Sequence, residues 1–167
     1  LEKNSAYGSL SGGGGMHLST TRTMTLENSI LRQNVAKFGG GMNLANVALA
    51  SEGSRLENNE AYELSSLQII EDVFTVEEAV SDAKYGQGGN CFLSKNSSLD
   101  NVVLLQGKAR LGGGIYIDEQ YYSSSVISRC NLIHNRAAEG GGIYGSTVGT
   151  GNSRIDLQKN VFKGNAA

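Results

Sequence analysis

Clusters of two or more glycines recur along this chain, and each is followed by a short strand-like stretch. The residues that follow the clusters are Met16, Met42, Asn90, Ile115 and Ile143. The intervals between them are 26, 48, 25 and 28 residues, and 48 is close to twice 24. Self-similarity at a fixed period of this length is the sequence signature of a solenoid, in which each repeat forms one coil. The pattern therefore predicts a repeat protein with one further repeat hidden in the long interval.

A second mark supports the same period. An asparagine stands eight residues before Met42 and before Ile143, three residues after a large apolar residue, as in Leu31-x-x-Asn34. Leu104-x-x-Gly107 has the same spacing before Ile115. The same rule predicts the hidden repeat at Leu56-x-x-Asn59, with Leu67 as its strand position. From Asn4 to Asn165 the chain would then hold about six coils of roughly 25–30 residues each.

The stretches between the glycine clusters predict strands rather than helices. Met24-Thr25-Leu26 and Ile155-Asp156-Leu157 alternate apolar with polar residues, and a period of two places every second side chain on one face of a strand. Asn, Ser, Thr and Gly between such runs supply turns. A repeat of this length has room for three short strands, so stacked coils would form three parallel sheets around one core. We therefore expect an all-β, right-handed parallel β-helix solenoid, its hand following from the chirality of parallel crossovers.

Equivalent residues of successive coils should lie above one another. The expected inward columns are Met16, Met42, Leu67, Asn90, Ile115 and Ile143; then Leu18, Leu44, Ile69, Phe92 and Ile117; and then Leu31, Leu56, Val80, Leu104, Leu132 and Phe162. A structural ladder of side-chain amides that bond one another along the axis is expected at one turn. Its members are Asn4, Asn34, Asn59, Asn135 and Asn165, interrupted by Ala83 and Gly107. The glycines are expected to permit tight packing at a corner.

Composition fits a single elongated unit. The 167 residues include 23 glycines, no proline and 18% charged residues, and no linker divides residues 1–167. No apolar run approaches the roughly 18 residues of a membrane span, and no signal peptide begins the chain. Because the chain starts and stops inside a repeat, we expect one β-helix segment, a fragment of a longer repeat protein.

The joint motif Φ-x-x-N followed by G-G-[AILVM]-Φ, where Φ is a large apolar residue, resembles a known repeat. It is similar to the repeat of the polymorphic outer-membrane protein family, which comprises chlamydial autotransporter passengers, and similar repeats occur in large surface proteins of algae and protists. The residues that carry the resemblance are Leu31 and Asn34 with Gly39 to Met42, Leu132 and Asn135 with Gly140 to Ile143, and Phe162 with Asn165. The chain departs from the motif at Ser65-Ser66, Ala83 and Gly107. The resemblance implies an extracellular β-helix used for adhesion or as a surface scaffold, without catalysis.

The sequence contains no set of residues that predicts catalysis or the binding of a cofactor. The net charge of −2 and the absence of a basic run argue against nucleic-acid binding. His17 and His134 stand at different positions of the repeat, so a shared metal is not expected. The acidic residues between Glu71 and Asp82 spread along one coil, whereas calcium needs about six to eight converging oxygens, so they predict a solvated face. We expect no metal, no cofactor and no enzyme activity.

The cysteines and one sequon permit further predictions. Cys91 and Cys130 fall in different parts of the coil, which predicts two free, packed thiols rather than a disulfide. Asn96-Ser97-Ser98 is the single N-glycosylation sequon, which makes Asn96 a candidate glycan site if the source is a eukaryote.

Two classes of function remain open. The favoured one is a non-catalytic structural or adhesive segment of a large extracellular or cell-surface protein, with other protein chains, further repeats or surface glycans as partners. The alternative is the core of a carbohydrate-active β-helix enzyme such as a polysaccharide lyase. An enzyme would cluster carboxylate or basic side chains of consecutive coils on one outer face. The outward positions expected here are His17, Asn43, Gln68, Cys91, Tyr116 and Tyr144, which form no such set.

The longest segments between repeats mark the candidate binding face. Insertions in repeat proteins map to loops on one face, often the binding face. Two adjacent coils carry the longest segments, with Tyr121 and Tyr122 in one and Ser146, Thr147 and Val148 in the other. Tyrosine with serine and glycine makes an adaptable contact surface. We expect these segments to project side by side as partner-binding loops, and merely tolerated surface insertions are the alternative.

Overall fold

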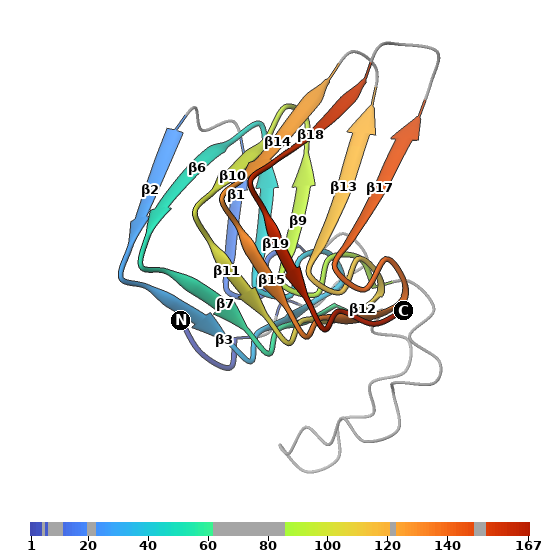
Figure 1. Ribbon diagram of the computed structural model, residues 1–167. Coiled ribbons are helices and arrows are strands. Elements are labelled where there is room, and N and C mark those ends of the chain that lie inside the picture. The colour runs from blue at the N-terminus through green and yellow to red at the C-terminus, as the bar shows by residue number, and fades with distance from the viewer. Residues whose placement is uncertain (5, 7–11, 20–22, 62–85, 121–122, 149–152) are drawn as a thin grey trace.

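The chain folds as an all-β parallel solenoid of about four turns (Figure 1). The computed structural model describes residues 1–4, 6, 12–19, 23–61, 86–120, 123–148 and 153–167, and no helix occurs among them. Each coil passes through four short strands, and equivalent strands of successive coils pair in parallel. The first sheet consists of β1 (Met16–Ser19), β5 (Met42–Ala45), β9 (Cys91–Ser94), β13 (Ile115–Gln120) and β17 (Ile143–Val148). The second consists of β2 (Thr23–Glu27), β6 (Ala48–Glu52), β10 (Ser98–Asp100), β14 (Ser124–Ser128) and β18 (Arg154–Gln158).

Two further sheets complete the coil. The third consists of β3 (Ile30–Arg32), β7 (Arg55–Glu57), β11 (Val103–Leu105), β15 (Asn131–Ile133) and β19 (Val161–Lys163). The fourth consists of β4 (Val35–Ala36), β8 (Glu60–Ala61), β12 (Lys108–Leu111) and β16 (Arg136–Glu139). The expectation of three sheets was wrong because the residues after the asparagine turn also pair between coils, although β4 and β8 are only two residues long.

The expectation of six coils was also wrong. Met42 pairs directly with Cys91, so no separate coil lies between them. Phe38, Gln87 and Leu111 bridge in one row, which places Gly86 level with Lys37. Residues 62–85 are therefore an insertion of one repeat's length between Ala61 and Gly86, within a single coil. The expected coil positions Leu67, Gln68, Ile69, Val80 and Ala83 lie outside the described residues.

The core columns follow the prediction with one shift. Leu31, Leu56, Leu104, Leu132 and Phe162 stack as predicted in the third sheet. In the first sheet, Met16, Met42, Cys91, Ile115 and Ile143 form one column, and Leu18, Leu44, Leu93, Ile117 and Gly145 form the other. Cys91 and Leu93 thus replace the predicted Asn90 and Phe92, because Asn90 belongs to the turn and not to the strand. The leucines of the inner coils are fully buried.

Three consecutive positions of each glycine cluster perform different tasks. The first is left-handed, with φ between 62° and 70° at Gly13, Gly39, Gly88, Gly112 and Gly140. The second lies against the backbone of the residue that follows the asparagine turn: a Cβ on Gly113 would come within 2.4 Å of the Arg136 carbonyl oxygen. The third faces the asparagine side chain, and a Cβ on Gly114 would lie 3.2 Å from Cγ of Asn135. The first two positions of the turn from the fourth sheet into the first therefore require glycine, whereas the third is occupied by Asn90 in one coil.

The asparagine ladder exists and is longer than predicted. Side-chain amides bond one another along the axis at 2.9–3.0 Å through Asn4, Asn34, Asn59, Asn90, Asn135 and Asn165. Each buried amide also satisfies backbone groups: the Asn135 side chain donates to the Leu104 carbonyl and accepts from the Gly107 N–H. The predicted interruption at Gly107 is absent, because Asn90 reaches in from the glycine cluster of the same coil. Gly107 leaves the space that this side chain fills: a Cβ there would lie 2.5 Å from Nδ2 of Asn90.

Candidate interaction surface

Charged side chains on the outer faces pair from one coil to the next. Arg32 of β3 lies 2.8 Å from Glu2, and Lys108 of β12 lies 3.0 Å from Glu60 of β8. These residues are separated by about one coil, and Lys108 and Glu60 are register partners. Exposed ion pairs contribute only about 0–1 kcal/mol each. These surface ion pairs are thus weak contacts between neighbouring coils.

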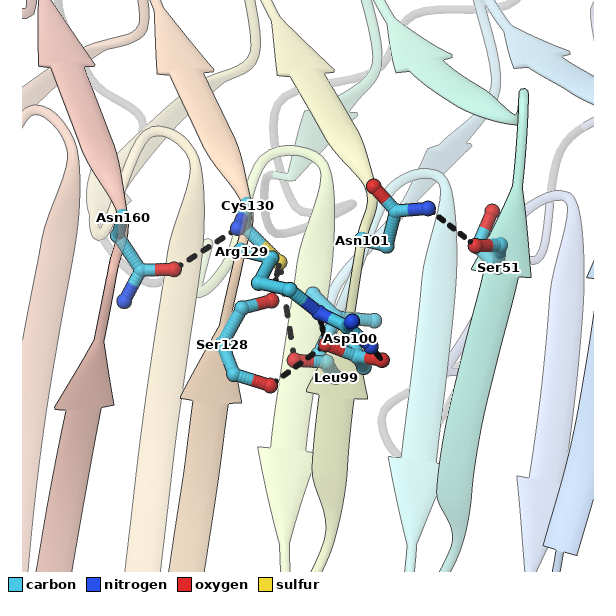
Figure 2. A network of polar contacts seen from close by, with 8 residues as sticks. All are labelled: Ser51, Leu99, Asp100, Asn101, Ser128, Arg129, Cys130 and Asn160. Atoms are coloured by element: carbon cyan, nitrogen blue, oxygen red, sulfur yellow. Dashed lines mark hydrogen bonds and ion pairs between the residues drawn. The ribbon is translucent and has the colours of Figure 1, made fainter.

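The densest polar network lies at the corner between the second and third sheets (Figure 2). The Asp100 carboxylate accepts from Ser128 Oγ at 2.6 Å, from Arg129 Nε at 2.9 Å and from Arg129 Nη2. Both donor residues belong to the next coil. The Arg129 guanidinium lowers the pKa of Asp100 below its usual range, and burial opposes this shift. Asp100 thus occupies one edge of the guanidinium, through Nε and Nη2, and the network joins two neighbouring coils.

The two cysteines are free and buried, as predicted. Cys130 lies behind the Asp100 network: its N–H donates to Oδ1 of Asn160 at 2.9 Å, and its thiol donates to the Leu99 and Ser128 carbonyls (Figure 2). Burial raises the pKa of the Cys130 thiol to about 11 and raises that of Cys91 further. Both groups are therefore packed thiols and not nucleophiles at neutral pH.

A row of aromatic rings on the outside of the first sheet is a feature that the sequence reasoning missed. Phe92 stacks on Tyr116 with centroids 5.2 Å apart, and Tyr116 stacks on Tyr144 at 5.5 Å. The interplanar angles of 14° and 10° mean that ring faces meet ring faces along the axis. Sugars bind to the faces of aromatic rings, and in this row the faces of neighbouring rings cover one another. The row therefore stabilises the stack rather than forming a sugar platform. The sequence signal for this row is the aromatic residue at the second position of β9, β13 and β17. The prediction counted Asn90 as the first strand residue, which placed Phe92 on the inner face.

The predicted partner-binding segments lie in adjacent coils, but only part of them can be placed. Ser146, Thr147 and Val148 are not loop residues: they belong to β17 and pair with Asp118, Glu119 and Gln120 of β13. Tyr121 and Tyr122 lie outside the described residues. β13 and β17 have six residues each, whereas β9 has four, so these two coils extend past their neighbours (Figure 1). We call the strands β13, β14, β17 and β18 the flange.

A buried carboxylate lies inside the flange. Glu119 is fully buried and accepts a hydrogen bond from Ser125 Oγ, which is also fully buried. Its second oxygen has no hydrogen-bond partner among the residues that the structure describes. One carboxylate with one hydroxyl is not a catalytic pair for glycoside cleavage, which needs two carboxyl groups across the scissile bond.

The candidate glycan site Asn96 lies at an exposed turn between β9 and β10. Its backbone is left-handed, with φ of 61°, and its Oδ1 accepts from the Ser124 N–H at 2.7 Å. Substitution of Nδ2 by a sugar would leave that acceptor in place. Glycosylation at Asn96 stays a prediction.

Candidate catalytic side chains do not gather on an outer face of the described coils. The outward row of the first sheet is His17, Asn43, Phe92, Tyr116 and Tyr144. Phe92 replaces the predicted Cys91, and Gln68 lies outside the described residues. Within the described ranges, no group of three or more His, Cys, Asp or Glu side chains could hold a metal ion. In the same part of the chain, no helix is long and apolar enough to cross a membrane.

These features define the class of the protein: a parallel β-solenoid whose repeating turns are held by an internal asparagine ladder. No family model, no curated protein and no solved structure matches the chain.

Proposed function

We propose that this chain is a non-catalytic structural or adhesive segment of a large extracellular or cell-surface protein. The observation that carries the proposal is the unbroken asparagine ladder, which links the successive coils by direct amide contacts. Together with the aromatic row and the Asp100 network, it devotes much of the polar and aromatic chemistry of the chain to contacts between coils. Such bonding between coils is expected of a stiff rod rather than of a catalytic cleft.

The resemblance to the polymorphic outer-membrane protein repeat supports the same proposal. Both halves of that motif have a physical role, since the third glycine of a cluster lies against the asparagine side chain of the next coil. An adhesive role would place partner contacts on the flange, where Ser146 and Thr147 of β17 lie beside β13. Other protein chains, further repeats or surface glycans are the proposed partners.

The adhesive role can be tested with the flange. Beads coated with the folded chain should adhere to immobilised matrix proteins or glycans, and Thr147→Arg, at an exposed flange position, should reduce adhesion. Thr25→Arg, at an exposed position on β2 far from the flange in sequence, is the matched control. Equal adhesion of the two variants would place the contact elsewhere.

The alternative is a polysaccharide lyase core, and it predicts a product that can be measured. A lyase acting on pectate or alginate releases unsaturated uronates, which absorb in the ultraviolet. We expect no such absorbance from the purified chain with or without calcium. Steady release that depends on the folded protein would overturn the non-catalytic proposal.

A further inference from the structure

A groove of about 620 Å³ runs over the fourth sheet at β12 and β16. Two cationic residues, Lys108 and Arg136, line it together with five alanines, among them Ala109 and Ala137. Lys108 and Arg136 are register partners in neighbouring coils, and so are Ala109 and Ala137. The groove lining thus repeats from coil to coil, and each of these two coils contributes one cationic side chain and one alanine methyl group to the pattern.

The alanines of the groove belong to a row that runs through the whole chain. An alanine stands two residues after Asn4, Asn34, Asn59, Gly107, Asn135 and Asn165, at the turn that follows the third sheet: Ala6, Ala36, Ala61, Ala109, Ala137 and Ala167. Ala36 and Ala61 are buried, whereas Ala109 and Ala137 are partly exposed in the groove. A floor of methyl groups lets another backbone approach closely and offers apolar contact without hydrogen bonds.

The charge of the groove is only partly compensated. Lys108 Nζ lies 3.0 Å from Glu60, but Arg136 has no ion-pair partner among the residues that the structure describes. The described residues from 86 to 167 include eight Lys and Arg against five Asp and Glu, so this end of the solenoid is basic. A guanidinium binds a carboxylate through two parallel hydrogen bonds.

We propose that this groove docks an extended acidic peptide segment of a partner protein. Its carboxylates would meet Arg136 and Lys108, and its small apolar side chains would lie on the alanine floor. The floor favours a peptide over an acidic glycan. The groove lining supplies two cations and otherwise only alanine, so the hydroxyl groups of a glycan would find no side-chain hydrogen-bond partner there besides those cations.

The test is a nuclear magnetic resonance titration of the isotope-labelled chain with a capped octapeptide of alternating glutamate and alanine. The amide signals of Ala109, Arg136 and Ala137 should shift in a saturable manner at millimolar peptide. Arg136→Gln should weaken binding about fivefold or more, since it removes a close charge pair. Arg154→Gln is the matched control, because Arg154 is an exposed arginine off the groove that already pairs with Asp156. It should leave the affinity unchanged.

Three results would overturn the proposal. Equal binding of an octapeptide of alternating glutamine and alanine would remove the role of charge. Undiminished binding by Ala137→Leu, which fills the floor, would place the contact outside the groove. Shifts of the same amides by a heparin oligosaccharide, with none by the acidic peptide, would assign the groove to a glycan. The amide spectrum of each variant reports whether its fold is intact.

Discussion

At the scale of single residues, one exchange of positions accounts for the continuity of the ladder. Gly107 stands where the other coils have asparagine, and Asn90 stands where they have the third glycine. Asn90 bonds Asn59 on one side and Asn135 on the other, at 2.9 Å each. The chemistry of the turn is preserved, although neither residue occupies its usual place in the repeat.

Asn90→Ala should therefore destabilise the fold. It removes the acceptor for Nδ2 of Asn59 and the donor to Oδ1 of Asn135, and a buried group left unpaired costs about 1–3 kcal/mol. Asn131→Ala, at a partly exposed position on the outside of β15, should change the free energy of unfolding by less than about 0.5 kcal/mol. Urea denaturation measures both. Equal stability of the two variants would remove Asn90 from the ladder's energetics.

The Asp100 network predicts a dependence on pH. Arg129 depresses the pKa of Asp100 in the folded state, so the network's contribution is present above the unfolded-state pKa of about 3.9. It is lost as the pH falls through the lower folded-state pKa. Asp100→Asn should thus reduce the melting temperature near pH 7, and the difference from the unmodified chain should shrink as the pH falls through and below that range. A difference that grows on acidification would contradict this assignment.

At the scale of elements, the turn from the fourth sheet into the first depends on backbone contact. A Cβ on Gly113 would meet the backbone N, C and O of Arg136 at 2.4–2.6 Å, and backbone atoms cannot move aside without breaking the pairing of β12 with β16.

Gly113→Ala should accordingly cost about 1–3 kcal/mol or more, the usual penalty for overpacking. Gly145→Ala is the matched control, because its Cβ would meet only the end of the Ile155 side chain at 2.7 Å, which can rotate away. Thermal unfolding should separate the two variants. If Gly145→Ala is the more damaging change, close backbone approach is not what selects glycine in the cluster.

At the scale of the whole molecule, the insertion at residues 62–85 separates what the sequence could predict from what it could not. The period of the glycine clusters and the asparagines predicted a parallel solenoid, its third column and most of its ladder. The insertion has the length of one repeat and carries Leu67 and Val80 near repeat positions. The period of the sequence alone therefore predicted an additional coil there. Only pairing between chain segments distant in sequence, such as Met42 with Cys91, reveals that it lies within one coil.

The candidate surface was less predictable for a related reason. Asn90 follows the glycines at the position where other repeats begin their strand, so the prediction made it the first strand residue. The strand in fact begins at Cys91, and the predicted orientations of Cys91 (outward) and Phe92 (inward) were therefore reversed. The alternation of a strand has a period of two, so a shift by one residue reverses every side chain. The aromatic row was lost by this single step. The fourth sheet was missed because its strands have only two to four residues, too few for a detectable alternation.

Deletion of residues 62–85 should leave the solenoid folded. It would join Ala61 to Gly86, which matches the direct sequence Ala36-Lys37 in the coil before. Loop length has only a weak effect on stability, about 0.6 kcal/mol per doubling. Circular dichroism should show an unchanged β spectrum, with a melting temperature within a few degrees of the parent chain. An unfolded deletion variant would show that the insertion is required for the coil that contains it.

The ladder also gives the molecule a direction. Each ladder amide from Asn4 to Asn135 donates to the next asparagine of the ladder, and each from Asn34 to Asn165 accepts from the one before. The side-chain amide dipoles therefore point the same way, and bonds in such a chain polarise one another. The two ends are chemically different: the amide oxygen of Asn4 faces one way and the amide nitrogen of Asn165 the other. The ladder is thus electrically oriented, and a partner that bonds to it must present a hydrogen-bond donor at the Asn4 end and an acceptor at the Asn165 end.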